Sequence, residues 1–112
     1  MMSGILERDV TVDYRLSWED VHVHARHDTP VGRMFEVLEA AAAARGRVRG
    51  DPSPGRVDRV DVFLDEKGNI ISVSVRGPLE LAEKIATEIV PGARRRVPEE
   101  EDFHVFLAPG RE

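Results

Sequence analysis

The stretch VDRVDVFLDEKGNIISVSVR, residues 57–76, decides the fold class, because two runs of alternating residues flank a charged turn. One face of the two runs carries six aliphatic residues: Val60, Val62, Leu64, Ile71, Val73 and Val75. In the turn Asp65–Asn69, Gly68 can take the positive φ that a short hairpin loop with a bulge requires. The stretch therefore predicts a half-buried antiparallel β-hairpin.

Length and composition predict a single α+β domain spanning residues 1–112, long enough to bury a core without disulfides. The absence of cysteine excludes thiol catalysis, cysteine-ligated zinc and a disulfide framework. No run approaches the roughly 18 apolar residues of a membrane span. The N-terminal sequence MMSGILERDV has neither the basic leader nor the apolar core of a signal peptide. We expect a cytoplasmic protein with no membrane partner.

The charge balance disfavours nucleic acid as a partner. Sixteen basic and twenty-one acidic residues give a net charge of −5, which repels a phosphate backbone. Arginines do gather around the loop that precedes the hairpin and again at residues 94–96. The loop group is Arg45, Arg47, Arg49, Arg56 and Arg59. We interpret both groups as solvated surface charges.

Two further strands are expected before the hairpin. Alternation from Val10 to Leu16 predicts the first, and Val21–His27 the second. In the second strand Val21, Val23 and Ala25 would face the core. The two strands can pair as a hairpin, or the first can be an edge addition, and the spacing does not decide between these arrangements.

Two helices are expected, each with one apolar stripe. The first starts at Asp28-Thr29-Pro30 and ends at Arg45-Gly46. Its predicted core stripe is Val31, Met34, Phe35, Leu38 and Ala42. The second runs from Gly77-Pro78 to Pro91-Gly92. Its predicted stripe is Leu79, Ala82, Ile85, Ala86 and Ile89.

The chain closes with a short edge strand within Ala93–Val97 and a better strand at Phe103–Leu107, with Phe103, Val105 and Leu107 expected inward. Without the first strand, the order is βαββαβ. Two helices with one stripe each must cover the same face of a mostly antiparallel sheet. We therefore predict a two-layer ferredoxin-like sandwich with an extra N-terminal strand and one open sheet face.

The open face is predicted to be a contact surface, because it mixes aromatic residues with histidine and arginine. Its expected members are His22, His24, Arg26, Arg59, Asp61, Phe63, Ile70, Ser72, Ser74, Arg76, His104 and Phe106. Pairing with a second copy of the chain is the commonest explanation for such a face. A small-molecule ligand or a nucleic acid are the alternatives.

The residues of this face are of types that serve two kinds of chemistry. His22 and His24 share one side of a strand and are candidate metal ligands, with His104 or Asp61 as a third. No further carboxylates complete a hydrolytic metal site, and we expect no metal and no cofactor. RNA would stack on Phe63 and Phe106, but the usual glycine-aromatic run is missing.

The segment VHVHARHDTPVGRMFEVLEAAAAARG, residues 21–46, and the helix exit PGARRRV, residues 91–97, resemble an ACT domain. ACT domains are small βαββαβ modules that bind amino acids and other small ligands and regulate enzymes by pairing side by side. The resemblance implies a ligand at the junction of first strand and first helix, at Asp28, Pro30 and Gly32. Val31 separates the proline and glycine that usually adjoin in that family.

Together these features predict a non-enzymatic, ligand-binding or regulatory module that forms a homodimer through its open sheet face. The enzyme alternative is a small dimeric barrel-like protein in which His22, His24 or His104 acts in a pocket between two sheets. The RNA-binding surface is the third possibility.

Overall fold

The computed structural model describes residues 14–49, 55–96 and 102–111. These residues form six strands in one mixed sheet and two helices, so the α+β class is confirmed. The strands are β1 (Tyr14–Trp18), β2 (Val21–Ala25), β3 (Arg59–Leu64), β4 (Ile70–Arg76), β5 (Arg94–Arg95) and β6 (Phe103–Leu107). The helices are α2 (Val31–Arg49) and α3 (Leu79–Ile89).

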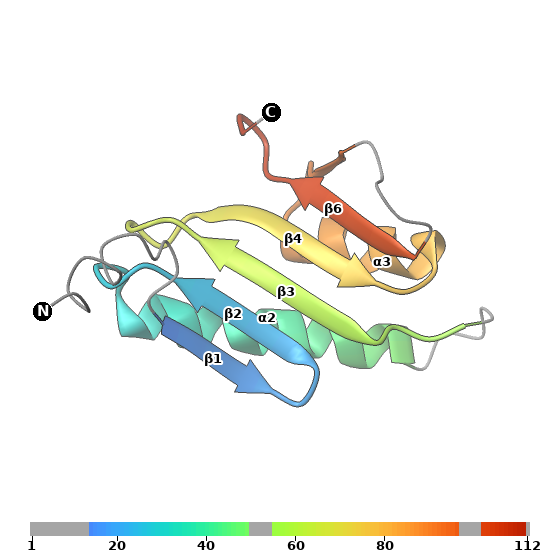
Figure 1. Cartoon of the computed structure of the whole chain (residues 1–112), viewed down its shortest axis with the longest axis horizontal. Coiled ribbons are helices and arrows are strands. Elements are labelled where there is room, and N and C mark those ends of the chain that lie inside the picture. Colours follow the sequence, from blue (N-terminus) through green and yellow to red (C-terminus); the bar gives the residue numbers. More distant parts are fainter. Residues whose placement is uncertain (1–13, 50–54, 97–101, 112) are drawn as a thin grey trace, which may run out of the picture.

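The strand order is β1-β2-β3-β4-β6-β5, and β2 and β3 are parallel neighbours while every other pair is antiparallel (Figure 1). A ferredoxin-like sheet instead places another strand between the two that flank the first helix. The predicted ferredoxin-like topology is therefore not confirmed. Alternation along a strand determines which side chains point inward, whereas strand neighbours depend on the path of the crossover helix.

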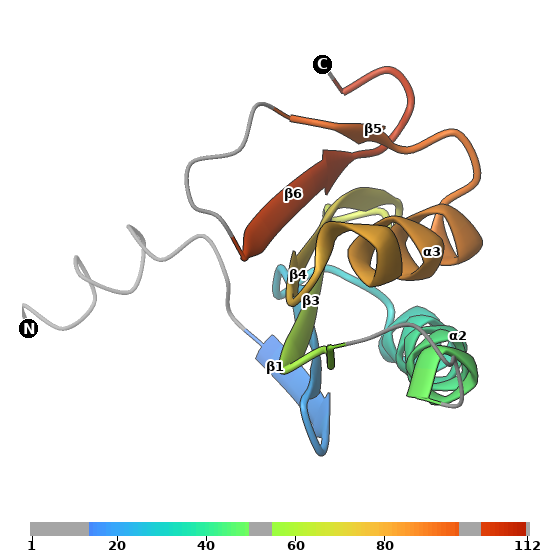
Figure 2. The same ribbon diagram turned by 90° about the vertical axis from the view of Figure 1, so that its right-hand side faces the viewer.

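Both helices cover the same face of the sheet, and the other face carries no helix among the described residues (Figure 2). Helix α2 packs on β1, β2 and β3, and α3 packs on β4, β6 and α2. The core between the layers is formed mainly by aliphatic residues of the central strands. They are Val21, Val23, Ala25, Val60, Val62, Leu64, Val73 and Val75. The predicted two-layer arrangement with one open face is confirmed.

The hairpin of β3 and β4 forms as the alternation predicts. Its turn closes through a hydrogen bond from the Asp65 amide to the Asn69 carbonyl (2.9 Å), and Gly68 has φ of 87°. A bulge lies between Phe63 and Leu64. Because the bulge shifts the register, Ile70 lies opposite Leu64 and packs against the core, not on the open face as expected.

The N-terminal strands form an antiparallel hairpin, which decides between the two arrangements that the sequence allowed. Leu16 lies opposite Val23, and Glu19 in the turn has φ of 54°. The part of the predicted first strand before Tyr14 lies outside the described residues. Strand β5 is short and lies at the opposite edge of the sheet, as expected for the arginine triple.

Helix α2 differs from the prediction in length and in buried face. It continues to Arg49 and does not end at Gly46. The apolar side chains that it buries are Met34, Val37, Ala41, Ala44 and Val48. The predicted stripe was correct for Met34 but wrong for Val31 and Phe35, which are 61% and 52% exposed. The buried stripe is hard to recognise in the sequence, because it includes Ala41 and Ala44 within a run of alanines. A buried helix face is usually recognised by larger apolar residues.

Strand β6 has the opposite face inward from the one predicted. His104 and Phe106 lie opposite Val75 and Val73 and are buried under the helices, whereas Val105 is on the open face. Four of the five residues in FHVFL are apolar, so a period of two alone does not choose the face. Helix α3, in contrast, buries Ala82, Ile85 and Ala86 as predicted.

The loop arginines are not all solvated. The side chain of Arg45 is only 7% exposed and donates hydrogen bonds to the Asp20 carboxylate (2.8 Å) and to the Val57 carbonyl. The interpretation of Arg45 as a surface charge was therefore wrong. The Arg45 side chain connects the C-terminal part of α2 to the β1–β2 turn and to the segment that leads into β3.

Candidate functional site

The open face of the sheet assembles most of the residues that the sequence assigned to it. The pairing of strands brings eight of them together: His22, His24, Arg59, Asp61, Phe63, Ser72, Ser74 and Arg76. Arg26 follows the end of β2 and is exposed. His104 and Phe106 are absent from this face because they are buried on its other side. In their place β6 contributes Val105 and Leu107, and β1 contributes Arg15 and Ser17.

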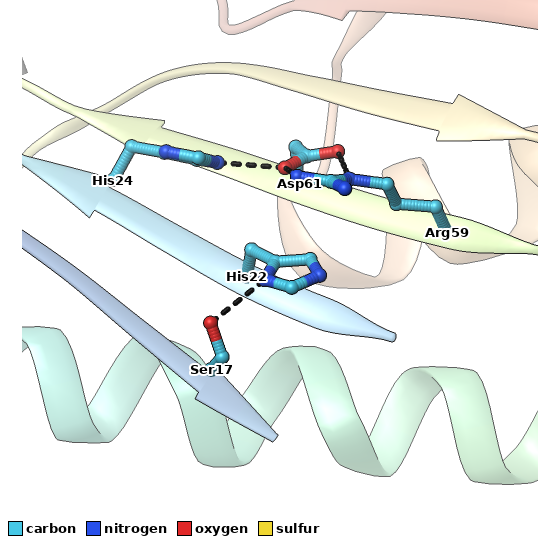
Figure 3. A network of polar contacts seen from close by, with 5 residues as sticks. All are labelled: Ser17, His22, His24, Arg59 and Asp61. Carbon is cyan, nitrogen blue, oxygen red and sulfur yellow. Dashed lines mark hydrogen bonds and ion pairs between the residues drawn. The ribbon is translucent and has the colours of Figure 1, made fainter. Parts of the chain in front are cut away.

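A network of three charged or polar side chains lies at the centre of this face (Figure 3). The Asp61 carboxylate lies 2.6 Å from Nε2 of His24. Its other oxygen accepts a hydrogen bond from Nε of Arg59 at 2.8 Å, and the guanidinium makes a second contact at 3.2 Å. The side chains of His24 and Asp61 are 12% and 13% exposed. Asp61 thus has both oxygens engaged within the face itself.

The pKa of Asp61 reflects this network. Burial raises it, but hydrogen bonds from His24 and Arg59 and the charge of Arg59 outweigh burial and lower the pKa to about 2. The carboxylate therefore stays ionised at neutral pH. A permanently charged, fully engaged carboxylate suits an ion-pair partner better than a general acid or base, which needs a pKa near the working pH.

His22 forms a second, separate pair on the same face. Its Nδ1 lies 2.7 Å from Oγ of Ser17 across the β1–β2 pair (Figure 3). Burial is the main cause that lowers the pKa of His22, with the positive charge of Arg59 adding to it. At neutral pH His22 is therefore a neutral ring. Ser17 was not predicted, although the alternation through Tyr14 and Leu16 places it on the open side.

Aromatic contacts complete the face. The rings of Phe63 and His24 stack with centroids 4.5 Å apart and planes 11° from parallel. The guanidinium of Arg76 lies 5.0 Å from the centre of the Phe103 ring and 3.5 Å from Asp102. Apolar and charged groups alternate across the strands, and Arg59 and Arg76 each contact a carboxylate, of Asp61 and Asp102 respectively.

The enzyme alternative loses its three-histidine set, because His104 lies on the far side of the sheet from His22 and His24. Among the described residues, no group of three or more His, Asp or Glu side chains is placed to hold a metal ion. Ser17 and His22 alone are a weak nucleophile–base pair, because no group orients the other nitrogen of His22 among the contacts described. The RNA surface loses Phe106 to the core.

The predicted ligand residues Asp28, Pro30 and Gly32 all lie exposed at the start of α2. Asp28 pairs with His27 at 3.0 Å, and both side chains are 70% exposed. Thr29 lies between Asp28 and Pro30 and is buried. Its hydroxyl donates a hydrogen bond to the Asp65 carbonyl, which connects this turn to the β3–β4 hairpin. A ligand at this turn stays a prediction.

Comparisons of the chain with protein-family models, with curated proteins and with solved structures found no match. In the part of the chain that the structure describes, no helix is long and apolar enough to cross a membrane.

Proposed function

We propose that this protein is a non-enzymatic binding module that pairs with a second copy of itself through the open face of the sheet. The observation that carries the proposal is that the polar side chains at the centre of the face are hydrogen-bonded to one another. Asp61 is held by His24 and Arg59, and His22 by Ser17. A surface that receives a charged ligand at its centre would leave the central charged groups, here Asp61 and Arg59, without partners.

The energetics of burial favour this assignment. Covering an unpaired charge costs several kcal/mol, because the ion loses its hydration. On this face, hydrogen bonds already replace part of that hydration at Asp61, whose side chain is only 13% exposed. Phe63, Val105 and Leu107 are half-buried and still have apolar surface to cover. Covering that surface stabilises by about 25 cal/mol per Å².

A second copy is the partner that best fits a face of this composition. The central charges of each face are already paired within that face. When two copies meet, no large region of one charge sign therefore faces a region of the same sign. The module can then present its remaining surface to a small ligand or regulated partner. The exposed turn at Asp28, Pro30 and Gly32 is where we expect such a ligand, since a side chain at Gly32 would meet nothing within 4 Å.

The test exploits the absence of cysteine from the chain. A Ser72→Cys thiol would lie on the open face, beside Phe63 and Leu107. We expect its alkylation by a maleimide to slow several-fold as the protein concentration rises, because pairing covers it. An Ala43→Cys thiol on the exposed side of α2 is the matched control and should react at one rate throughout. Equal rates for Ser72→Cys at all concentrations would refute the proposal.

A further inference from the structure

The exposed large apolar side chains of the described residues all lie along one margin of the molecule, away from the open face. They are Tyr14 (53% exposed), Trp18 (62%), Val31 (61%) and Phe35 (52%). Tyr14 and Trp18 belong to β1, and the other two to α2, which packs beside it. A hollow of about 450 Å³ adjoins them, lined by Trp18, Leu38, Glu39 and Ala42. We call this region the β1 margin. Apolar patches of this kind usually mark interaction sites.

The β1 margin includes a free sheet edge. Within the described residues β1 pairs only with β2 and is the last strand of the sheet (Figure 1). The outer backbone N–H and C=O groups of an edge strand are a template for another strand. Natural edges are usually short, charged or covered, whereas β1 carries a single charge, Arg15, in five residues.

We infer that β1 pairs antiparallel with β1 of a second copy, about a two-fold axis through Leu16. This surface is distinct from the open face and goes beyond the function proposed above. In this register Tyr14 lies opposite the partner's Trp18, and Leu16 opposite the partner's Leu16. Aromatic and aliphatic cross-strand pairs of this kind are favourable. On the other side of the strand Arg15 meets the partner's Ser17, so like charges do not face each other directly.

The helices leave room for this contact. Helix α2 packs on β2 as well as on β1, so two paired β1 strands would have one α2 on either side of them. The aromatic side chains of both copies would fill the groove between the two helices. Ala42 contributes only a methyl group to the hollow beside Trp18, and a side chain at Gly46 would meet nothing within 4 Å. The partner's Tyr14 can therefore enter that hollow.

The exposed aromatic side chains supply part of the area that a specific contact needs. Tyr14, Trp18 and Phe35 each retain more than half of their exposure. With roughly 200 Å² per aromatic side chain, they supply about 300 Å² of apolar surface per copy. Val31, Leu38 and the five-residue strand add to this area, toward the roughly 800 Å² per partner of a standard interface.

Trp18 is the only tryptophan of the chain, so its fluorescence reports directly on this contact. The experiment uses the full chain with Phe63→Glu, which removes pairing through the open face. We expect its mass to double from 12.5 kDa as concentration rises. Over the same range the emission should shift to shorter wavelength and acrylamide quenching should fall at least twofold. Adding Phe35→Glu should abolish all three changes.

The control is Ala43→Glu, which places the same charge on an exposed position of α2 outside the β1 margin and should leave the changes intact. A mass that stays at 12.5 kDa in the Phe63→Glu protein, with Trp18 exposed throughout, overturns the inference. So does a tryptophan that is shielded at every concentration, because a segment of the same chain would then cover it. Neither result bears on the open face, which the Ser72→Cys thiol tests separately.

Discussion

Asp61 contacts both His24 and Arg59, and its lowered pKa predicts a contribution to stability. A fall in pKa from 3.8 to about 2 corresponds to about 2 kcal/mol at full strength, and to about 1–2 kcal/mol after allowance for solvent. Because the pKa in the folded state is depressed, this contribution is present above pH 4 and is lost as the pH falls toward 2.

Asp61→Asn should therefore lower the free energy of unfolding by about 1–2 kcal/mol at pH 7, measured by urea denaturation at fixed protein concentration. The difference from wild type should shrink between pH 4 and pH 2. Asp58→Asn, at an exposed carboxylate just before β3, is the matched control and should change little. A loss for Asp61→Asn no greater than that of the control would mean that the network contributes no stability.

The lowered pKa of His22 predicts a second loss of stability on acidification, at higher pH than the loss due to Asp61. The pKa of His22 is lowered in the folded state, so below about pH 6.5 the unfolded chain binds a proton more readily than the folded chain. Stability should therefore decline on acidification from pH 7 to pH 5. His22→Gln, which keeps a partner for Ser17, should flatten that decline. His27→Gln, at a side chain that is 70% exposed, should retain the wild-type slope, and an equal slope for all three proteins would contradict the assignment.

Sequence reasoning reached part of the site at this scale. The x-His-x-His alternation in β2 and the matching run in β3 predict that His22, His24, Arg59 and Phe63 share one face. The contacts among them depend on the parallel pairing of β2 with β3, which places His22 opposite Asp61. No sequence pattern within either strand indicates that β2 and β3 pair.

At the scale of elements, β6 is the strand whose orientation most affects the open face. Phe106 is 1% exposed and lies under the helices, whereas Phe103 is partly exposed on the open side. Phe106→Ala should therefore cost about 3–5 kcal/mol of unfolding free energy, as for other buried phenylalanines. Phe103→Ala should cost much less, because it removes mainly the contact with Arg76. The reverse order of the two losses would restore the orientation that the sequence first suggested.

The elements also show where sequence patterns succeed and fail. The β3–β4 hairpin and α3 were predictable, because clear alternation and a clear apolar stripe leave one solution. Helix α2 and β6 were mispredicted on their buried faces, because an alanine run and an almost wholly apolar strand each fit two orientations. Their packing is decided by neighbouring elements and not by their own sequences.

At the scale of the whole molecule, the two proposed contacts lie on different surfaces and use different chemistry. The open face would stack on its copy through side chains, and the β1 margin would extend the sheet through backbone hydrogen bonds. If both contacts form, wild type should reach four times 12.5 kDa, and the loss of either contact should halve it. Two isologous contacts close into a tetramer when their two-fold axes intersect at right angles.

Pairing of the open face with its copy can be measured separately from pairing through the β1 margin by comparing two variants. Absolute mass is measured by light scattering over a concentration series for Trp18→Glu, which disables the β1 margin, and for the same protein with Phe63→Glu added. We predict a dimer of twice 12.5 kDa for the first protein and a monomer for the second. A Trp18→Glu protein that is monomeric throughout, or a dimer that survives Phe63→Glu, would contradict pairing through the open face.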